Sequence, residues 1–179
     1  MTRPAELDFR VAGRDDAQCL GTLGTQVFLD TYATSGIRLA LAREAEALFS
    51  AAATLARLNE RGRRTLLAER SGHLIGFAEL SLATPHPLAA ADSAAELSRL
   101  YVQSPFLRQG VGRSLLRRAE ALALAEGASI VWLTAWIGNH RALAFYASQG
   151  YTPLGSADHD FEGEHFENRV FSKTLRAET

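Results

Sequence analysis

The chain has 179 residues, 47% hydrophobic and 22% charged, as is ordinary for a folded globular protein. Its 19 basic and 20 acidic residues leave a net charge of −1, which argues against a generally basic nucleic-acid-binding protein. The single cysteine, Cys19, excludes an intramolecular disulfide framework, and no apolar run is long enough to span a membrane. Residues 1–10 lack the apolar core of a secretory signal, so we expect a cytoplasmic protein.

The first half of the chain predicts a strand, two helices and a hairpin. Apolar residues alternate with charged ones at the start, and two later segments carry apolar residues at helical spacing. Ser71-Gly72 is a typical two-residue turn between strands, and two prolines disfavour a strand after the hairpin. The predicted elements are a strand at 7–11, helices at about 15–32 and 39–59, strands at 65–70 and 73–82, and a loop at 84–94.

The second half is more regular. The predicted elements are a strand at 96–102, a helix at 110–126, a strand at 130–136, a helix at 139–149, and strands at 151–155 and 170–175. Gly127 and Gly150 follow the two helices, as is common at helix C-termini. The element order therefore predicts a single α/β domain over residues 1–179, with a mixed, mostly antiparallel sheet of about seven strands and four helices.

A glycine-containing turn precedes the predicted helix at 110–126. Gly110 and Gly112 let the backbone approach a ligand closely, and free N–H groups at a helix N-terminus favour an anion such as a phosphate. Arg108 and Arg113 flank the turn and add charged donors. Tight packing is an alternative explanation of the same glycines. The missing Gly-Lys-Ser/Thr ending excludes a P-loop, and a leucine at the third glycine position excludes a Rossmann turn.

A second group of residues lies one strand later. Asn139 is a good N-cap for the predicted helix at 139–149, and Tyr146 follows about two turns along it. A buried tyrosine usually belongs to the core, whereas a tyrosine that reaches a cleft can donate a proton to a leaving group. Tyr146 alone does not decide between these readings.

Together these segments resemble the GNAT family of acyl-CoA-dependent N-acetyltransferases. The resemblance is carried by Glu-Leu-Ser-Arg-Leu-Tyr-Val at 96–102, Arg-Gln-Gly-Val-Gly-Arg at 108–113 and Asn-x-x-Ala-x-x-Phe-Tyr-x-x-x-Gly-Tyr at 139–151. Phe-Leu-Asp-Thr-Tyr at 28–32 and Val-Trp-Leu-Thr-Ala-Trp at 131–136 are similar to bacterial spermidine/spermine-type acetyltransferases. Two positions depart from the family pattern, because Leu107 stands where glutamine or arginine is usual and Arg108 where glycine is often found.

The resemblance implies one acetyltransferase domain over 1–179, with the fourth and fifth strands splayed, and acetyl-CoA as co-substrate without a metal. The backbone groups of Leu100 and Val102 would hold the pantetheine arm, and a backbone N–H near Tyr101 or Val102 would polarise the thioester carbonyl. Asn139 would contact the cofactor arm. The implied pyrophosphate-binding residues are Arg108, Gln109, Gly110, Val111, Gly112 and Arg113.

The resemblance also implies direct attack of an amine on the thioester, with Tyr146 protonating the departing CoA thiolate. Because a free amine is largely protonated at neutral pH, a carboxylate is expected as the base. Glu96 is the first candidate and Glu79 the second, and each can instead be a solvated carboxylate at a strand end. We expect no catalytic role for His73. His140 lies in the first turn of its helix, where it could touch the cofactor, but we expect it to be exposed.

The acceptor is the least defined part of the prediction. Acidic residues crowd the segment before the last strand and could attract a polycation, or could simply form a solvated hairpin tip. These are Asp158, Asp160, Glu162, Glu164 and Glu167, opposed by a basic group of Arg108, Arg113, Arg117 and Arg118. We expect a small primary amine, with a polyamine as one candidate. Acetylation of a protein N-terminus or lysine, a non-catalytic acyl-CoA sensor, and the choice between monomer and homodimer stay open. No nucleic-acid or membrane partner is expected.

Overall fold

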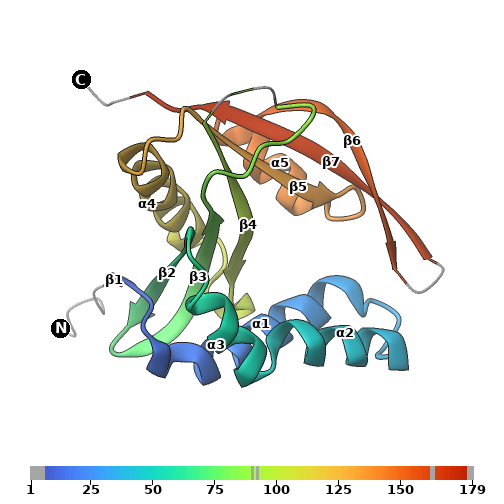
Figure 1. The fold of residues 1–179 in the computed structure, drawn as a ribbon. Coiled ribbons are helices and arrows are strands. Elements are labelled where there is room, and N and C mark those ends of the chain that lie inside the picture. The colour runs from blue at the N-terminus through green and yellow to red at the C-terminus, as the bar shows by residue number, and fades with distance from the viewer. Residues whose placement is uncertain (1–6, 90, 92, 162–163, 177–179) are drawn as a thin grey trace. The chain divides into compact units, whose positions relative to one another are not determined.

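Seven strands form one mixed sheet in the order β1-β2-β3-β4-β5-β7-β6 in a computed structural model of the chain. The structure describes residues 7–89, 91, 93–161 and 164–176 (Figure 1). The chain divides into two compact units, one comprising the residues up to Glu79 with Arg99–Ala119, the other Leu80–Ser98 with the residues from Glu120 onward. No helix within these described ranges has the length and hydropathy that a membrane span requires.

The first unit contains three helices and the strands on which they pack. Its complete elements are β1 (Leu7–Val11), α1 (Ala17–Tyr32), α2 (Leu39–Phe49), α3 (Ala51–Leu58) and β2 (Arg63–Arg70). It also holds most of β3 (His73–Ser81), the end of β4 (Ala94–Val102) and the start of α4 (Val111–Ala125). Ser71 and Gly72 both have positive φ, 52° and 75°, which confirms the predicted two-residue turn between β2 and β3.

Adjacent residues on β3 show how helices cover both faces of this unit's strands. Phe77 packs with Leu20, Leu23 and Val27 of α1. A side chain at the preceding Gly76 would come within 3.3 Å of Leu115 of α4 and 2.8 Å of the Tyr101 carbonyl oxygen. Because successive strand residues point to opposite faces, α1 lies on one face and the start of α4 on the other (Figure 1).

The helix predicted over residues 39–59 is two helices, so the described chain has five α-helices instead of four. Ser50 separates them, with φ of −54° and ψ of 151°. Its hydroxyl accepts a hydrogen bond from the Ala53 N–H at 3.3 Å and caps α3. The prediction was wrong because the apolar stripe continues across Ser50, whereas the serine side chain stabilises a new helix start.

The second unit is built around β5 (Ile130–Trp136), which matches its predicted bounds. β5 pairs antiparallel with β7 (Glu164–Thr174) along its whole length, but parallel with β4 over three residue pairs only. That parallel ladder ends where Glu96 lies opposite Trp132, while β4 continues to Val102. The short ladder agrees with the expected splay between the fourth and fifth strands.

The last two strands are longer than predicted. α5 (His140–Ser148) leads into β6 (Thr152–Phe161), which pairs antiparallel with β7. The acidic residues Asp158, Asp160 and Glu167 therefore lie on paired strands and not in a loop. Exposed polar strands give no clear apolar alternation, which is why the sequence predicted only their inner ends.

Lys173 on β7 is the only lysine in the sequence. Its Nζ lies 2.9 and 2.8 Å from the two carboxylate oxygens of Glu120, on α4. The lysine side chain is 29% exposed and that of Glu120 13%. This ion pair fastens the last strand to the C-terminal part of α4 inside the second unit.

Candidate active-site residues

The loop before α4 exposes a set of backbone N–H groups. It begins with a 3-10 turn at Ser104–Phe106, and Arg108 and Gly110 then adopt positive φ of 60° and 83°. Ser114 is the first residue to donate a hydrogen bond back along the helix, to the Gly110 carbonyl at 3.0 Å. The N–H groups just before Ser114 have no acceptor within the helix, so they can bind an anion.

Basic side chains surround this loop. Arg108, Arg113, Arg117 and Arg118 are all exposed. The Arg118 guanidinium carbon lies 4.3 Å from the centre of the Phe9 ring on β1, which ties the first turns of α4 to the sheet. Leu107 is half-buried, and its side chain brings no donor to the loop. The sequence prediction that positive charge gathers around this turn is consistent with these positions.

The end of β4 supplies both packing and backbone groups. Leu100, Tyr101 and Val102 are half-buried, and the Tyr101 ring lies 5.3 Å from Phe77 and 6.0 Å from Phe49, centre to centre. Burial raises the pKa of the Tyr101 phenol, so this side chain stays protonated and acts as packing. Any role of Tyr101 in ligand binding therefore falls to its backbone.

Glu79, the second candidate for the base, is enclosed by arginines. It is 4% exposed, so it is not a solvated strand-end carboxylate. Its Oε1 accepts hydrogen bonds from Arg99 and, at 3.0 Å, from Arg63, and its Oε2 lies 3.5 Å from Arg57 Nε. Burial lowers the pKa of Arg57, while the charge of Glu79 acts in the opposite direction. With its oxygens bound in this way, Glu79 anchors α3 to β2, β3 and β4 and is poorly placed to accept a proton from an amine.

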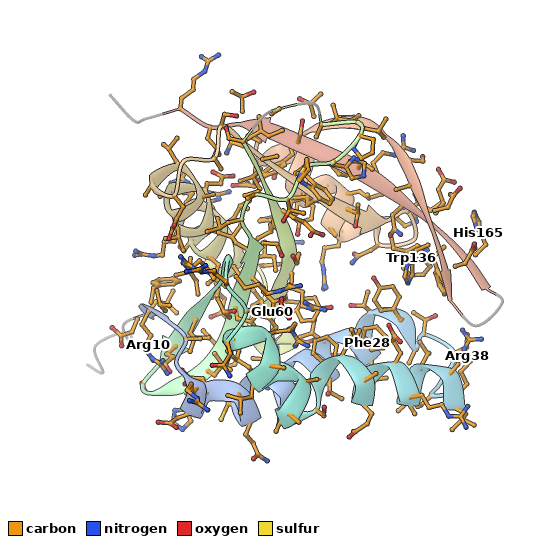
Figure 2. The ribbon with its side chains drawn as sticks, in the orientation of Figure 1. Arg10, Phe28, Arg38, Glu60, Trp136 and His165 are labelled. Carbon is orange, nitrogen blue, oxygen red and sulfur yellow. The ribbon has the colours of Figure 1, made fainter. Side chains whose placement is uncertain are left out.

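Glu60 joins the same region from its edge. It lies in the connection between α3 and β2 and hydrogen-bonds to Arg63 (Figure 2). Its side chain is 48% exposed, against 5% for that of Glu79. Glu79, which contacts three arginines, is therefore the centre of this group of charged side chains, and Glu60 lies at its exposed edge.

Glu96, the first candidate for the base, belongs to the second unit. It is half-buried and stands at the last residue pair of the β4–β5 ladder, opposite Trp132. β4 stops pairing with β5 after this residue. Glu96 is the more accessible of the two candidate carboxylates.

Asn139 and Tyr146 occupy the two ends of α5. Asn139 Oδ1 accepts a hydrogen bond from the Ala142 N–H at 3.1 Å and caps the helix, as predicted. Tyr146 is 9% exposed, and its ring centre lies 5.8 Å from that of Tyr151 and 6.2 Å from that of Phe171. The tyrosine ring thus belongs to the core of the second unit.

A small charged group lies near the end of the β6–β7 hairpin, where Figure 2 labels His165. His165 Nδ1 lies 2.8 Å from Asp160 Oδ1, and Nε2 lies 3.2 Å from Asp158 Oδ1. The hydrogen bond to Asp160, followed by the charge of Asp158, raises the pKa of His165. Glu162 lies outside the described residues, as does the side chain of Glu164.

The remaining predicted positions are simpler. His73 and His140 are both exposed, as expected for His140. In the part of the chain that the structure describes, no three His, Cys, Asp or Glu side chains gather as metal ligands would. Sequence reasoning passed over Arg70, which hydrogen-bonds to Gln109 across a separation of 39 residues. No local motif marks it.

Comparison with known proteins identifies the family of the chain. Residues 25–151 match the model of the Acetyltransferase (GNAT) family. An uncharacterised N-acetyltransferase of Mycobacterium bovis is 32% identical over 111 residues, 62% of this chain and 66% of that protein. Another, from the pepI 3′ region of Lactobacillus delbrueckii subsp. lactis, is 30% identical over 81 residues, 45% of this chain and 47% of that protein. The chain thus spans about half to two thirds of the length of these relatives.

A solved structure shows the same fold over nearly the whole chain. The crystal structure of PaiA N-acetyltransferase from Thermoplasma acidophilum, in complex with coenzyme A, superposes with a TM-score of 0.72. It is 22% identical in sequence, and the match covers 94% of this chain and 99% of that one. The family match extends over more than half of the sequence and includes the exposed loop before α4 and the whole of α5. The chain belongs to the GNAT family of acetyltransferases.

Proposed function

We propose that this protein, as one domain over residues 1–179, transfers an acetyl group from acetyl-CoA to a primary amine of a small molecule. The observation that carries the proposal is the loop before α4, where Arg108 and Gly110 hold the backbone in the left-handed region and leave the N–H groups at the helix start free for an anion. Family membership and the coenzyme A complex of the similar PaiA structure support the same donor.

The chain's own groups bind the donor at two places in this proposal. Residues Arg108–Arg113 receive the pyrophosphate through their N–H groups, the N-terminal dipole of α4 and the two flanking guanidiniums. The backbone of Leu100 and Val102 pairs with the pantetheine arm as an added strand would. The Asn139 amide, whose oxygen caps α5, has its Nδ2 group left to donate to the arm.

Acetyl transfer then requires two proton movements. The amine nitrogen forms a bond to the acetyl carbon while the carbon–sulfur bond breaks, and the electron pair goes to sulfur. Glu96 accepts the proton that the amine loses, and the Tyr146 hydroxyl donates a proton to the sulfur. A backbone N–H at Tyr101 or Val102 stabilises charge on the carbonyl oxygen, a contribution of about 2.7–4 kcal/mol to the barrier in comparable sites.

For the acceptor we propose a polyamine as the first candidate. Asp158 and Asp160 are exposed on the β6–β7 hairpin, with side-chain exposures of 63% and 81%. Neighbouring negative charges on a surface attract a polycation electrostatically. Protonated His165 cancels one of these charges, so the hairpin attracts cations more strongly when His165 is neutral.

A panel of amines tests the proposal. The protein is incubated with acetyl-CoA and each of spermidine, a monoamine, a lysine-containing peptide and a peptide with a free N-terminus, and thiol release is recorded. We expect turnover with small primary amines, highest with spermidine. Turnover with the peptides but not with the small amines would show that the acceptor is a protein and contradict the small-molecule proposal. No thiol release with any amine would contradict acetyl transfer. A reaction without any amine serves as the control for background hydrolysis of acetyl-CoA.

A further inference from the structure

We propose that Arg70, on β2, is a cofactor-binding residue that supplies positive charge and N–H donors to the phosphates of coenzyme A. The proposal rests on the proposed use of acetyl-CoA. Arg70 lies outside the segments that carry the family resemblance, and it reaches the loop before α4 from a different strand.

The register of the first two strands places Arg70 on the side of α4. Arg70 lies opposite Leu7, and Ala68 lies opposite Phe9. Paired residues in an antiparallel ladder share a face, as do residues two apart along one strand, so Arg70 and Phe9 are on the same face. Phe9 contacts Arg118 of α4. The Arg70 side chain therefore projects on the face that α4 covers.

Two contacts fix the Arg70 guanidinium against the loop. Arg70 Nη1 donates a hydrogen bond to Gln109 Oε1 at 3.0 Å, and Gln109 Nε2 donates to the Pro105 carbonyl at 2.9 Å. The guanidinium carbon also lies 5.2 Å from the centre of the Phe106 ring. Stacking and hydrogen bonding of this kind hold a long side chain in one orientation, which lowers the entropy cost of binding a ligand.

The charge of Arg70 is not balanced within the described residues. Its Nε is buried and has no hydrogen-bond partner, and no described carboxylate forms an ion pair with it. The neighbouring Glu69 is instead engaged by Arg10, which Figure 2 labels on β1. A buried donor left unpaired is costly, so an anion is the expected partner for this guanidinium.

The loop identifies that anion as a phosphate. Arg70 donates a hydrogen bond to Gln109, which lies between Arg108 and Gly110 in the sequence. Gln109 is next to the free N–H groups at the start of α4. Leu107 supplies no polar group where the family pattern has glutamine or arginine. A planar guanidinium donates two parallel hydrogen bonds to a phosphate, so Arg70 replaces the missing donor from a neighbouring strand.

Calorimetric titration with coenzyme A tests the inference without any acceptor. The variants are Arg70→Gln, Arg70→Lys, Gln109→Ala and, as a control for charge alone, Arg43→Gln, whose arginine is exposed on α2. We expect Arg70→Gln to raise the Kd about tenfold, as for the loss of one charge-assisted contact. Arg70→Lys should recover part of the lost affinity for coenzyme A. Gln109→Ala should lower the affinity less than Arg70→Gln does. Arg43→Gln should bind coenzyme A as the parent protein does.

The dependence of Kd on salt separates a direct contact from a role in holding the loop. If Arg70 binds phosphate, the Kd of Arg70→Gln rises less steeply with salt than that of the parent protein, because one screened charge pair is gone. Parent-like affinity of Arg70→Gln would overturn the inference. So would an Arg70→Lys variant that binds as weakly as Arg70→Gln with the parent's salt dependence.

Failure of the wider proposal gives a different result. A parent protein that does not bind coenzyme A would overturn the donor as well as the role of Arg70. A parent protein that binds coenzyme A but acetylates no amine would contradict the proposed function alone and leave the test of Arg70 intact. Thermal denaturation of each variant confirms that binding is measured on folded protein.

Discussion

The imidazole of His165 is held between two carboxylates, with Nδ1 2.8 Å from Asp160 Oδ1. Because this raises the pKa of His165, the folded protein keeps the proton to a higher pH than the unfolded chain, whose histidines titrate at about 6.5. The contact therefore stabilises the hairpin fully below that pH and is lost as pH rises through the raised pKa. We expect Asp160→Asn to lower the pKa of His165 in an NMR titration. An unchanged midpoint would contradict the pairing.

The same titration has a consequence for the acceptor. When His165 loses its proton, Asp158 and Asp160 are no longer partly neutralised. If a polyamine binds near this hairpin, its KM should fall as the pH rises through the pKa of His165. The His165→Gln variant should lose that step while keeping the rest of the pH profile.

Tyr146→Phe removes only the hydroxyl from a ring that is otherwise held by Tyr151 and Phe171. The ring packing is preserved, so coenzyme A affinity should stay within a few-fold, while turnover should fall at least tenfold if the hydroxyl protonates the leaving thiolate, a role typically worth about 10²–10⁴. Stopped-flow or steady-state thiol release measures this. Unchanged turnover would assign Tyr146 to the core alone.

The buried Glu79 should contribute far more to the stability of the fold than the exposed Glu60. Glu79→Gln leaves the surrounding arginines without their buried counter-ion, so we expect a loss of about 3–5 kcal/mol in the free energy of unfolding. Glu60→Gln, which removes an exposed partner of Arg63, should cost less than about 1 kcal/mol. Urea denaturation of both variants makes the comparison.

Glu96→Gln should instead leave stability nearly unchanged and lower turnover. If Glu96 accepts the proton of the amine, the loss should shrink at high pH, because more of the acceptor is then already deprotonated. An equal loss of turnover at every pH would point to a role for Glu96 other than that of a base.

Gly110 has a φ of 83° and open space where a side chain would stand. Gly110→Ala therefore meets no clash, and its cost is the left-handed backbone, about 1–2 kcal/mol. The loop can relieve that strain only by changing its conformation, so coenzyme A affinity should fall. Gly13→Ala is a suitable control, because Gly13 has a φ of −107° that alanine adopts freely.

Elements whose boundaries have a local cause were predictable from sequence. β5 is an apolar run that fits a buried strand, and Ser71-Gly72 and Asn139 are local signals that the structure confirms. The break at Ser50 was missed because serine is tolerated inside helices as well as at their starts. The candidate site divides in the same way. The loop before α4 follows from its glycines, whereas the contact of Arg70 with Gln109 depends on tertiary packing.

The ion pair between Lys173 and Glu120 has a practical consequence for acetylation assays. Because Lys173 is the only lysine, the chain offers one side-chain amine to a reactive thioester, and that amine is bound by both oxygens of a carboxylate. Spontaneous acetylation of this lysine by the donor should therefore be slow, because its amine is engaged by Glu120. Acetyl-lysine detected in a mixture with a protein substrate can be assigned to that substrate from the mass of its peptides. The protein thus carries a low internal background for the very modification it is proposed to make.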